Sequence, residues 1–253
     1  GTKQIYHAGF AYKGELLIRK AGKLFLDMLY PRRCPVCHDI AVPGGSRICN
    51  VCREKLKPIT GPRCFRCSKP LKREEQEYCK DCRKTRLFDQ GIGIFPYGSV
   101  LQESLFKLKY GKRQEYGSFY GQIAAVYSRE IIRNWGVEII IPIPLHRKRM
   151  EKRGYNQAEL IAEALGKTLC IPVDSRLMKR KVNTRPQKEL DYRERKQNMK
   201  NAFFLKGENR YRRILLVDDI YTTGSTIEAA AELLKRNGAE NVFFLTIAMG
   251  ADT

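Results

Sequence analysis

The chain has 253 residues, which is enough for one or two domains with a sizeable core. Its 48 lysines and arginines against 27 acidic residues give a formal net charge of +21, and this surplus favours a polyanionic partner such as nucleic acid over a merely solvated basic surface. No apolar run approaches the ~20 residues of a membrane-spanning helix, so no span is predicted. Charged residues interrupt the first thirty positions, so no signal peptide is predicted either, and a cytoplasmic protein is expected.

A helix is predicted over residues 14–29, where apolar side chains recur on one face every three or four positions. We expect it to dock on the rest of the protein, within an N-terminal extension that covers residues 1–30. The segment that follows is punctuated by cysteines and short of aliphatic side chains, so it needs another source of folding energy.

Eight of the nine cysteines form four C-x-x-C pairs whose first members recur every 15 residues. The pairs are Cys34/Cys37, Cys49/Cys52, Cys64/Cys67 and Cys79/Cys82. Two such pairs supply the four thiolates of a tetrahedral site, so two zinc ions are predicted, with iron as the weaker alternative and a disulfide framework disfavoured in a cytoplasmic chain. Since each ion would be fully ligated, residues 31–86 are expected to form a small structural double zinc-ribbon domain. The ninth cysteine, Cys170, is expected to be a small core residue.

The spacing alone does not decide which pairs share an ion. Sequential sharing, the first pair with the second and the third with the fourth, makes two ribbons in tandem, whereas interleaved sharing makes a cross-braced module. Residues 68–78 form a short polar segment suited to a hairpin, and residues 53–63 contain two prolines and suit a connector. This contrast favours sequential sharing.

Strands alternate with amphipathic helices from residue 87 onward. The predicted strands are 91–98, 137–144, 202–205, 213–219 and 241–249, and the predicted helices are 100–110, 116–134, 155–169 and 225–236. The alternation predicts an α/β domain over residues 87–253, with a mainly parallel open sheet flanked by helices. Ligands of such sheets bind beyond the carboxyl ends of the strands.

The segment ILLVDDIYTTGST, residues 214–226, joins a buried strand to two acids and a run of hydroxyls before a helix. Asp218 and Asp219 are predicted to end the strand, where they can accept hydrogen bonds from ribose hydroxyls and help to hold Mg²⁺. Residues 222–226 offer successive N–H groups in front of a helix dipole, which suits a phosphate, and Gly224 lets the chain wrap closely around it. A phosphorylated pentose is the predicted ligand, and a plain helix cap beside solvated acids is the alternative.

This pattern resembles the phosphoribosyl-diphosphate loop of the type I phosphoribosyltransferases. The resemblance assigns the ribose to Asp218 and Asp219 and implies that Mg²⁺ binds together with phosphoribosyl diphosphate. It assigns the 5′-phosphate to Thr222, Thr223, Gly224, Ser225 and Thr226. It also implies a diphosphate-facing loop at another strand end, for which residues 139–149 are the candidate and Arg147 and Lys148 could add charge.

Two further segments resemble the signature of the ComF family, the competence proteins of DNA uptake. Within residues 142–162 the matching positions are Arg149, Arg153, Gly154, Tyr155, Asn156, Gln157 and Ala158. Within residues 184–203 they are Thr184, Gln187, Leu190, Arg195 and Asn198. With LKYG at 108–111 and the paired zinc ribbons, the resemblance covers nearly the whole chain after residue 30.

The ComF resemblance implies a role in natural transformation, in which single-stranded DNA is handled at the inner face of the membrane beside a helicase-like competence protein. Basic runs at 147–153 and 176–200 support DNA binding and are expected to be loops around the sugar-phosphate pocket. The DNA-binding candidates are Arg149, Lys152, Arg153, Arg180, Lys181 and Arg185, with Tyr155, Tyr192 and Tyr211 as candidates for base stacking.

The sequence leaves the activity open. No catalytic acid–base constellation is found, and His146 is the only histidine in the diphosphate loop. Phosphoribosyl transfer depends mainly on positioning and charge stabilisation, so an enzyme is not excluded. Three functions are therefore carried forward: a DNA-uptake accessory protein that binds single-stranded DNA, an active phosphoribosyltransferase acting on a nucleobase, and a regulator or adaptor that senses the phosphoribosyl donor.

Overall fold

The computed structural model describes residues 31–181 and 202–251. The chain divides into two compact units, residues 1–56 and residues 57–253. The helix expected over residues 14–29 and the candidate Arg185 lie outside the described residues, as does Tyr192. No helix within the described ranges has both the length and the apolar character that crossing a membrane requires.

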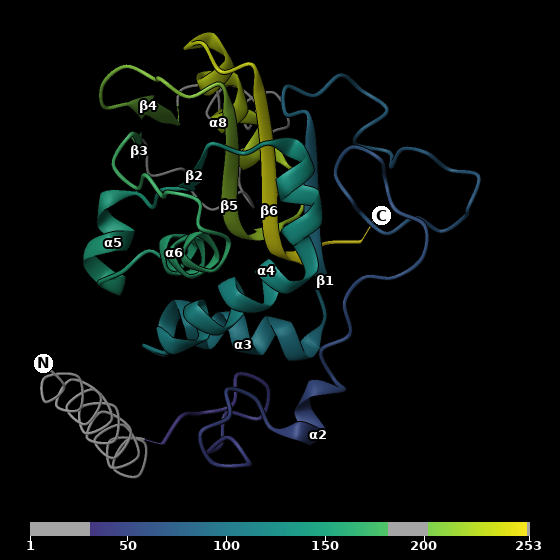
Figure 1. The fold of residues 1–253 in the computed structure, drawn as a ribbon, viewed down its shortest axis with the longest axis vertical. Coiled ribbons are helices and arrows are strands. Elements are labelled where there is room, and N and C mark those ends of the chain that lie inside the picture. Colours follow the sequence, from purple (N-terminus) through teal and green to yellow (C-terminus); the bar gives the residue numbers. More distant parts are fainter. Residues whose placement is uncertain (1–30, 182–201, 252–253) are drawn as a thin grey trace, which may run out of the picture. The chain divides into compact units, whose positions relative to one another are not determined.

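The larger unit is built on a four-stranded parallel sheet with the strand order β1-β6-β5-β2 (Figure 1). The strands are β1 (Gln90–Pro96), β2 (Ile139–Pro142), β5 (Arg213–Tyr221) and β6 (Asn241–Met249). β5 and β6 are central and almost continuously apolar, as expected for strands that are covered on both faces. The predicted α/β class and parallel sheet are confirmed.

Helices cover both faces of this sheet. They are α3 (Ser99–Tyr110), α4 (Glu115–Trp135), α5 (Arg147–Arg153), α6 (Gln157–Leu169) and α8 (Ser225–Arg236). On one face α6 packs against β5, β2 and α4, and Gly121 allows the two helices to approach, because a Cβ there would meet the Ile161 carbonyl oxygen. On the other face Leu234 of α8 belongs to a core cluster with Ile214 and Phe244.

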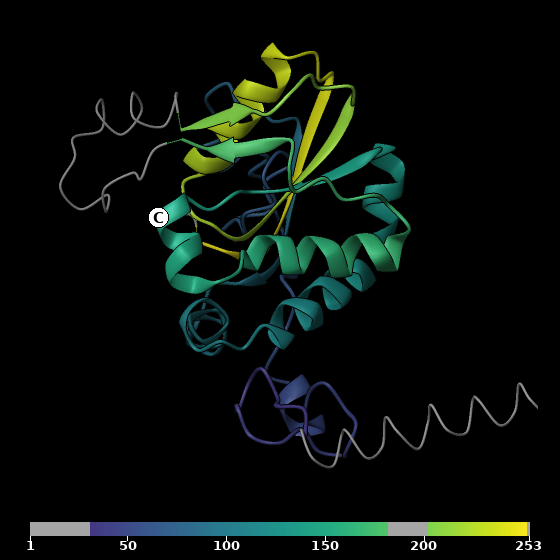
Figure 2. The same ribbon diagram turned by 90° about the vertical axis from the view of Figure 1, so that its left-hand side faces the viewer.

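A small antiparallel pair, β3 (Met178–Arg180) with β4 (Phe203–Leu205), lies beside α8 (Figure 2). The expectation that the whole 176–200 region is a loop is therefore wrong for its first residues. The Asp174 carboxylate accepts hydrogen bonds from the N–H groups of Arg176 and Leu177, and the buried Met178 anchors the strand that follows.

The basic run 147–153 is the helix α5, so the prediction of a loop there is wrong. The His146 side chain caps its first turn by accepting a hydrogen bond from the Lys148 N–H, and Arg147 pairs with Glu151 at 2.7 Å one turn later. Gly154 ends the helix with φ of 82°. These local interactions offset the repulsion among neighbouring basic side chains.

The strand β5 runs two residues beyond Asp219, where it was predicted to end. Its pairing with β2 stops at Val217, but its pairing with β6 continues to Tyr221. The two acids therefore lie on a strand that is still held on one side and has lost its neighbour on the other. This half-paired position lies at the carboxyl end of the sheet, where ligands of such folds bind.

The second cysteine group belongs to the larger unit and lies against the edge strand β1. The N–H of Ile59 donates to the Ile94 carbonyl at 2.9 Å, and the N–H of Gly91 donates to the Arg66 carbonyl at 2.8 Å. These bonds use part of the β1 edge that would otherwise remain unpaired. All four cysteines from Cys64 to Cys82 lie in the same core cluster as Phe244.

The two cysteine groups repeat one backbone pattern thirty positions apart. A β-bridge joins Arg33 to Ile40 in the first copy and Arg63 to Pro70 in the second. His38 and Ser68 occupy matching positions with φ of 67° and 64°. The structural repeat is thus a whole ribbon, which contains two of the C-x-x-C pairs that recur every 15 residues in the sequence.

Candidate functional site

The cysteines gather into two groups of four, in sequential order. One group is Cys34, Cys37, Cys49 and Cys52, and the other is Cys64, Cys67, Cys79 and Cys82, with the ligand atoms of each group within 4.8 Å of one another. Sequential sharing is confirmed and the interleaved alternative is wrong. None of the nine cysteines, all of which the structure describes, forms a disulfide, so the disulfide framework is not adopted.

Each group fits a structural zinc ion. Four sulfurs at the ~2.3 Å Zn–S distance of a tetrahedral site lie about 3.8 Å from one another. The Cys37–Cys49 and Cys67–Cys79 sulfur separations are 3.8 Å and 3.6 Å. The N–H groups of Val36 and Val42 point at cysteine sulfurs from 3.4 Å, which stabilises thiolates over thiols.

Cys170 is not a core residue, in contrast to the expectation. It is exposed and caps the C-terminus of α6 in the left-handed conformation, with φ of 58°. A small side chain at this position meets a backbone requirement and leaves the thiol in solvent.

We predict two zinc ions in the purified protein and one in Cys49→Ser, because a three-thiolate remnant with one hydroxyl binds zinc far more weakly. Metal content by mass spectrometry checks this. Cys170→Ser is the matched control and keeps both ions. Two ions in Cys49→Ser would contradict the assignment.

At the end of β5, a buried carboxylate is held by an ammonium group from a distant helix. Asp219 is 3% exposed, and its Oδ2 pairs with the Lys109 ammonium at the end of α3. Its Oδ1 accepts a hydrogen bond from the Gln157 amide at 2.9 Å. The neighbouring Asp218 is partly buried, and its Oδ1 accepts the Asp219 N–H at 2.8 Å.

The two carboxyl groups differ in their ionisation. Burial and the adjacent Asp219 charge raise the pKa of Asp218 well above its ordinary value. Burial also opposes ionisation of Asp219, but the Lys109 ammonium and the Gln157 amide outweigh it and lower the pKa of Asp219. The pair therefore offers one fixed carboxylate and one carboxyl that a cationic or hydroxyl-rich ligand would help to ionise.

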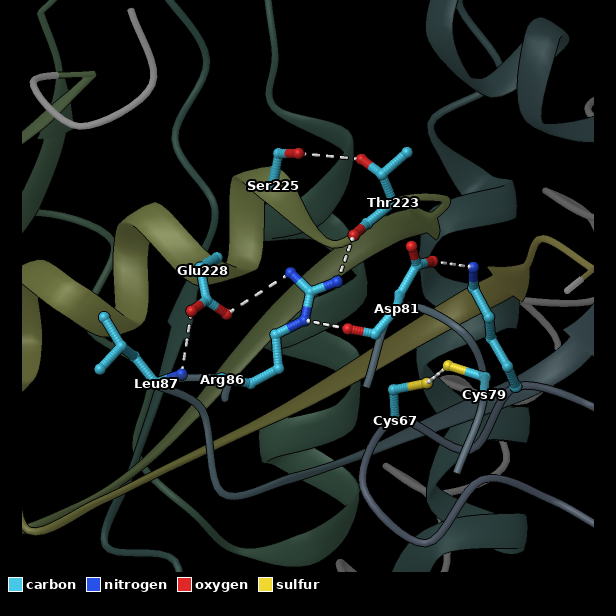
Figure 3. Close-up of polar contacts among 9 residues, drawn as sticks. Cys67, Cys79, Asp81, Arg86, Leu87, Thr223, Ser225 and Glu228 are labelled. Atoms are coloured by element: carbon cyan, nitrogen blue, oxygen red, sulfur yellow. Dashed lines mark hydrogen bonds and ion pairs between the residues drawn. The ribbon is translucent and has the colours of Figure 1, made fainter. Parts of the chain in front are cut away.

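The loop 222–226 follows directly, with Thr222 and Thr223 exposed and Ser225 starting α8 (Figure 3). Gly224 is the N-cap of α8 with φ of 80°, and no side chain caps the helix. A Cβ at Gly224 would collide with the Tyr221 phenol. The loop thus presents the N-terminus of α8 and two hydroxyls, of Thr223 and Ser225, that lie 2.9 Å apart.

Basic side chains surround the carboxylate pair. Burial, followed by the charge of Arg149, lowers the pKa of Arg180, and the Asp218 carboxylate opposes this effect. Arg153 acts electrostatically on Lys109 and donates to the Gln157 side-chain oxygen. Three of the DNA-binding candidates therefore lie near the predicted sugar site.

The remaining candidates lie in less constrained positions. Arg147, Lys148 and Lys152 are exposed on α5, and Lys181 is exposed just after β3. The Arg147 charge is already paired with Glu151. The roles proposed for these side chains stay predictions.

Of the three stacking candidates inferred from sequence, the two that the structure describes do not offer free rings. Tyr155 is buried and donates its hydroxyl to the Leu108 carbonyl, and Tyr211 packs against the core. Phe106 and Tyr110 form an exposed aromatic pair one turn apart on α3, with ring centres 5.0 Å apart. The Arg153 guanidinium lies 5.0 Å from the centre of the Tyr110 ring.

Two family models match the chain. The model described as Double zinc ribbon domain matches residues 25–83, and the model described as Phosphoribosyl transferase domain matches residues 150–252. The fold and the site thus define a protein that joins a double zinc ribbon to a phosphoribosyltransferase-like domain.

Curated relatives extend over most of the chain. Competence protein F of Haemophilus influenzae is 32% identical over 83% of this chain and 93% of that protein. Competence protein ComFC of Bacillus subtilis is 32% identical over 79% of this chain and 83% of that protein. DNA utilization protein YhgH of Escherichia coli K12 is 30% identical over 84% of this chain and 94% of that protein. The chain belongs to the ComF family of competence proteins.

Replacement of each acid by asparagine should change the free energy of unfolding in opposite directions. Asp219→Asn leaves Lys109 without its counter-charge and should lower the free energy of unfolding by about 3 kcal/mol. Asp218→Asn keeps the hydrogen-bond acceptor but removes a carboxyl that resists ionisation, so it should raise stability by about 1 kcal/mol at neutral pH.

The sign follows from the pKa of Asp218, which is higher in the folded protein than in the unfolded chain. Its ionisation therefore costs stability above the folded pKa, and this cost disappears as the pH falls to the ordinary value near ~4. Denaturant unfolding at several pH values checks both variants. A loss of stability in Asp218→Asn at neutral pH would contradict the assignment.

Proposed function

We propose that this protein serves DNA uptake in natural transformation by binding single-stranded DNA, and that it also binds phosphoribosyl diphosphate or a related sugar phosphate. The names of its relatives, competence proteins and DNA utilization proteins, support the first part. The Asp219–Lys109 pair beside the 222–226 loop is the observation that carries the second part.

The sugar-phosphate proposal depends on two kinds of group at one strand end. The carboxyl groups of Asp218 and Asp219 can accept hydrogen bonds from vicinal hydroxyls. A few residues further on, the N-terminus of α8 and the hydroxyls of Thr223 and Ser225 can hold a phosphate. A pentose with a terminal phosphate has both kinds of group.

Mg²⁺ is proposed to arrive with the diphosphate of the ligand. Mg²⁺ prefers oxygen ligands, would neutralise phosphate charge, and can be held by a carboxylate directly or through water. Asp218 is the better candidate, because the Asp219 carboxylate is already paired with Lys109.

The DNA proposal depends on an exposed surface that combines stacking with positive charge. The Phe106 and Tyr110 side chains are 60% and 61% exposed, which is unusual for neighbouring aromatic residues on one helix. Arg153 stacks on Tyr110 and can also contact a phosphate, and exposed bases of a single strand can stack on aromatic and guanidinium faces. The net charge of +21 would favour the encounter.

A helicase-like competence protein is the partner proposed for uptake, at the inner face of the membrane. Membership of the ComF family supports this partner.

Phosphoribosyl diphosphate with Mg²⁺ should bind the wild-type protein, and Gly224→Ala should weaken this binding about tenfold or more, because the added Cβ meets Tyr221 and φ is positive. Isothermal titration calorimetry measures both. Gly238→Ala is the matched control, since Gly238 also has positive φ but a Cβ there meets nothing within 4 Å.

The same titration separates the functions that the sequence left open. Release of diphosphate in the presence of a nucleobase would identify an active phosphoribosyltransferase. Binding without turnover, with a change in DNA affinity, would identify a donor-sensing regulator. Absence of binding by the wild-type protein would contradict the sugar-phosphate proposal.

Single-stranded oligonucleotides should bind with a steep salt dependence, and Phe106→Ala and Tyr110→Ala should each weaken binding about tenfold through the loss of stacking. These two changes should leave the salt slope unchanged. By contrast, Arg149→Gln and Lys152→Gln should each reduce the slope by about 0.7 if each contacts one phosphate.

Fluorescence anisotropy across a salt series measures affinity and slope together. Tyr127→Ala is the control, because Tyr127 is also exposed but its ring faces Phe95. Equal losses in Tyr127→Ala and Tyr110→Ala would contradict the proposed surface.

A further inference from the structure

We propose that the second cysteine group is part of the sugar-phosphate site, and that Arg86 is the positioning residue through which its metal fixes the 222–226 loop. The metal would thereby control the order of the sugar-phosphate site, and the identity of the ligand rests on the function proposed above. Its structural part, the coupling of metal to loop, stands on contacts within the larger unit.

Arg86 connects the metal-binding turn to the loop through its backbone partners (Figure 3). Its Nε donates to the carbonyl of Asp81 at 3.0 Å, and Asp81 lies between the metal ligands Cys79 and Cys82. Its Nη2 donates to the carbonyl of Thr223 at 3.2 Å. One rigid guanidinium thus joins the cysteine turn to the loop that is predicted to hold phosphate.

The start of α8 is held by the same segment. Glu228 accepts the N–H of Leu87 at 3.0 Å and lies 3.9 Å from the Arg86 guanidinium. The Arg86 side chain is only 16% exposed, so water competes weakly for these partners. The backbone direction of the loop and the first turn of α8 are both set by residues that follow Cys82.

A second connection runs beneath the loop. Lys69 is 4% exposed, pairs with Asp81 at 2.7 Å, and places its ammonium 5.9 Å from the centre of the Tyr221 ring. The Tyr221 ring shares a core cluster with Cys67 and lies directly under Gly224. The second ribbon therefore contacts the loop from below, through Lys69 and Tyr221, as well as at the Thr223 carbonyl, through Arg86.

These contacts give the metal a role beyond folding its own ribbon. Loss of the metal removes the four metal–sulfur bonds that hold the cysteine side chains together, so the turn from Cys79 to Cys82 would open when the metal is lost. The Asp81 carbonyl and carboxylate would then move, and Arg86 and Lys69 would lose their common anchor. Loop amides that are no longer preorganised bind an anion less tightly.

Arg86→Gln tests the connection without touching a metal ligand. Amide exchange at residues 222–226, followed by mass spectrometry, should become about tenfold faster, and ribose 5-phosphate should bind about tenfold more weakly, since a charged hydrogen bond is lost. Zinc content should remain at two ions. Arg86→Lys should fail to restore either property, because an ammonium cannot reproduce the fork that joins Asp81 to Thr223.

The controls separate this role from general loss of charge or metal. Arg83→Gln removes the same charge from an exposed position three residues away and should change neither exchange nor affinity. Cys49→Ser and Cys79→Ser each remove one zinc, but only Cys79→Ser should loosen the 222–226 loop. If Cys79→Ser does not fold, the Arg86 variants still test whether the cysteine turn and the 222–226 loop are coupled.

Unchanged loop exchange in Arg86→Gln, rescue by Arg86→Lys, or equal loosening by both cysteine variants would overturn the proposal. If the wild-type protein binds no sugar phosphate, the proposed function of the loop fails, whereas the exchange measurements still test the coupling to the metal.

Discussion

A carboxylate buried at the end of a strand requires a nearby counter-charge, and Asp219 obtains one only because Lys109 reaches it from α3. This ion pair joins α3 to β5, and the Gln157 amide adds α6 to the same point. The surrounding helices are thereby fixed around the carboxyl end of the sheet. The fixed charge of Asp219 has a consequence for Asp218: burial and this neighbouring charge raise the pKa of Asp218 and oppose its ionisation.

The proposed DNA surface and the proposed sugar-phosphate site share residues. Tyr110 is next to Lys109 in the chain, and Arg153 contacts both the Tyr110 ring and the Gln157 side chain. A strand of DNA that draws Arg153 toward a phosphate would alter the hydrogen bonding of Gln157 to Asp219. If both proposed ligands bind, each would alter the affinity of the other through these contacts.

The sequence predicts most of the fold and the loop at residues 222–226, because strand–helix alternation and the Asp-Asp-x-x-Thr-Thr-Gly-Ser-Thr pattern are local signals. Lys109 and Arg86 could not be assigned roles, since each acts on a partner far away in the sequence. The dense positive charge of residues 147–153 predicts a loop, but His146 caps the first turn of a helix there and Gly154 ends it. Tyr155 and Cys170 were misplaced because neither burial nor a left-handed cap is evident from residue type.

The ribbon repeat has unequal consequences for its two copies. Both adopt one backbone pattern, but the second copy is built into the core while the first lies in the other compact unit. At equivalent positions the first copy has an exposed Asp39 where the second has the buried Lys69. A substitution in the second copy therefore disturbs the core of the phosphoribosyltransferase-like domain as well as the ribbon, whereas a substitution in the first copy acts within the smaller unit.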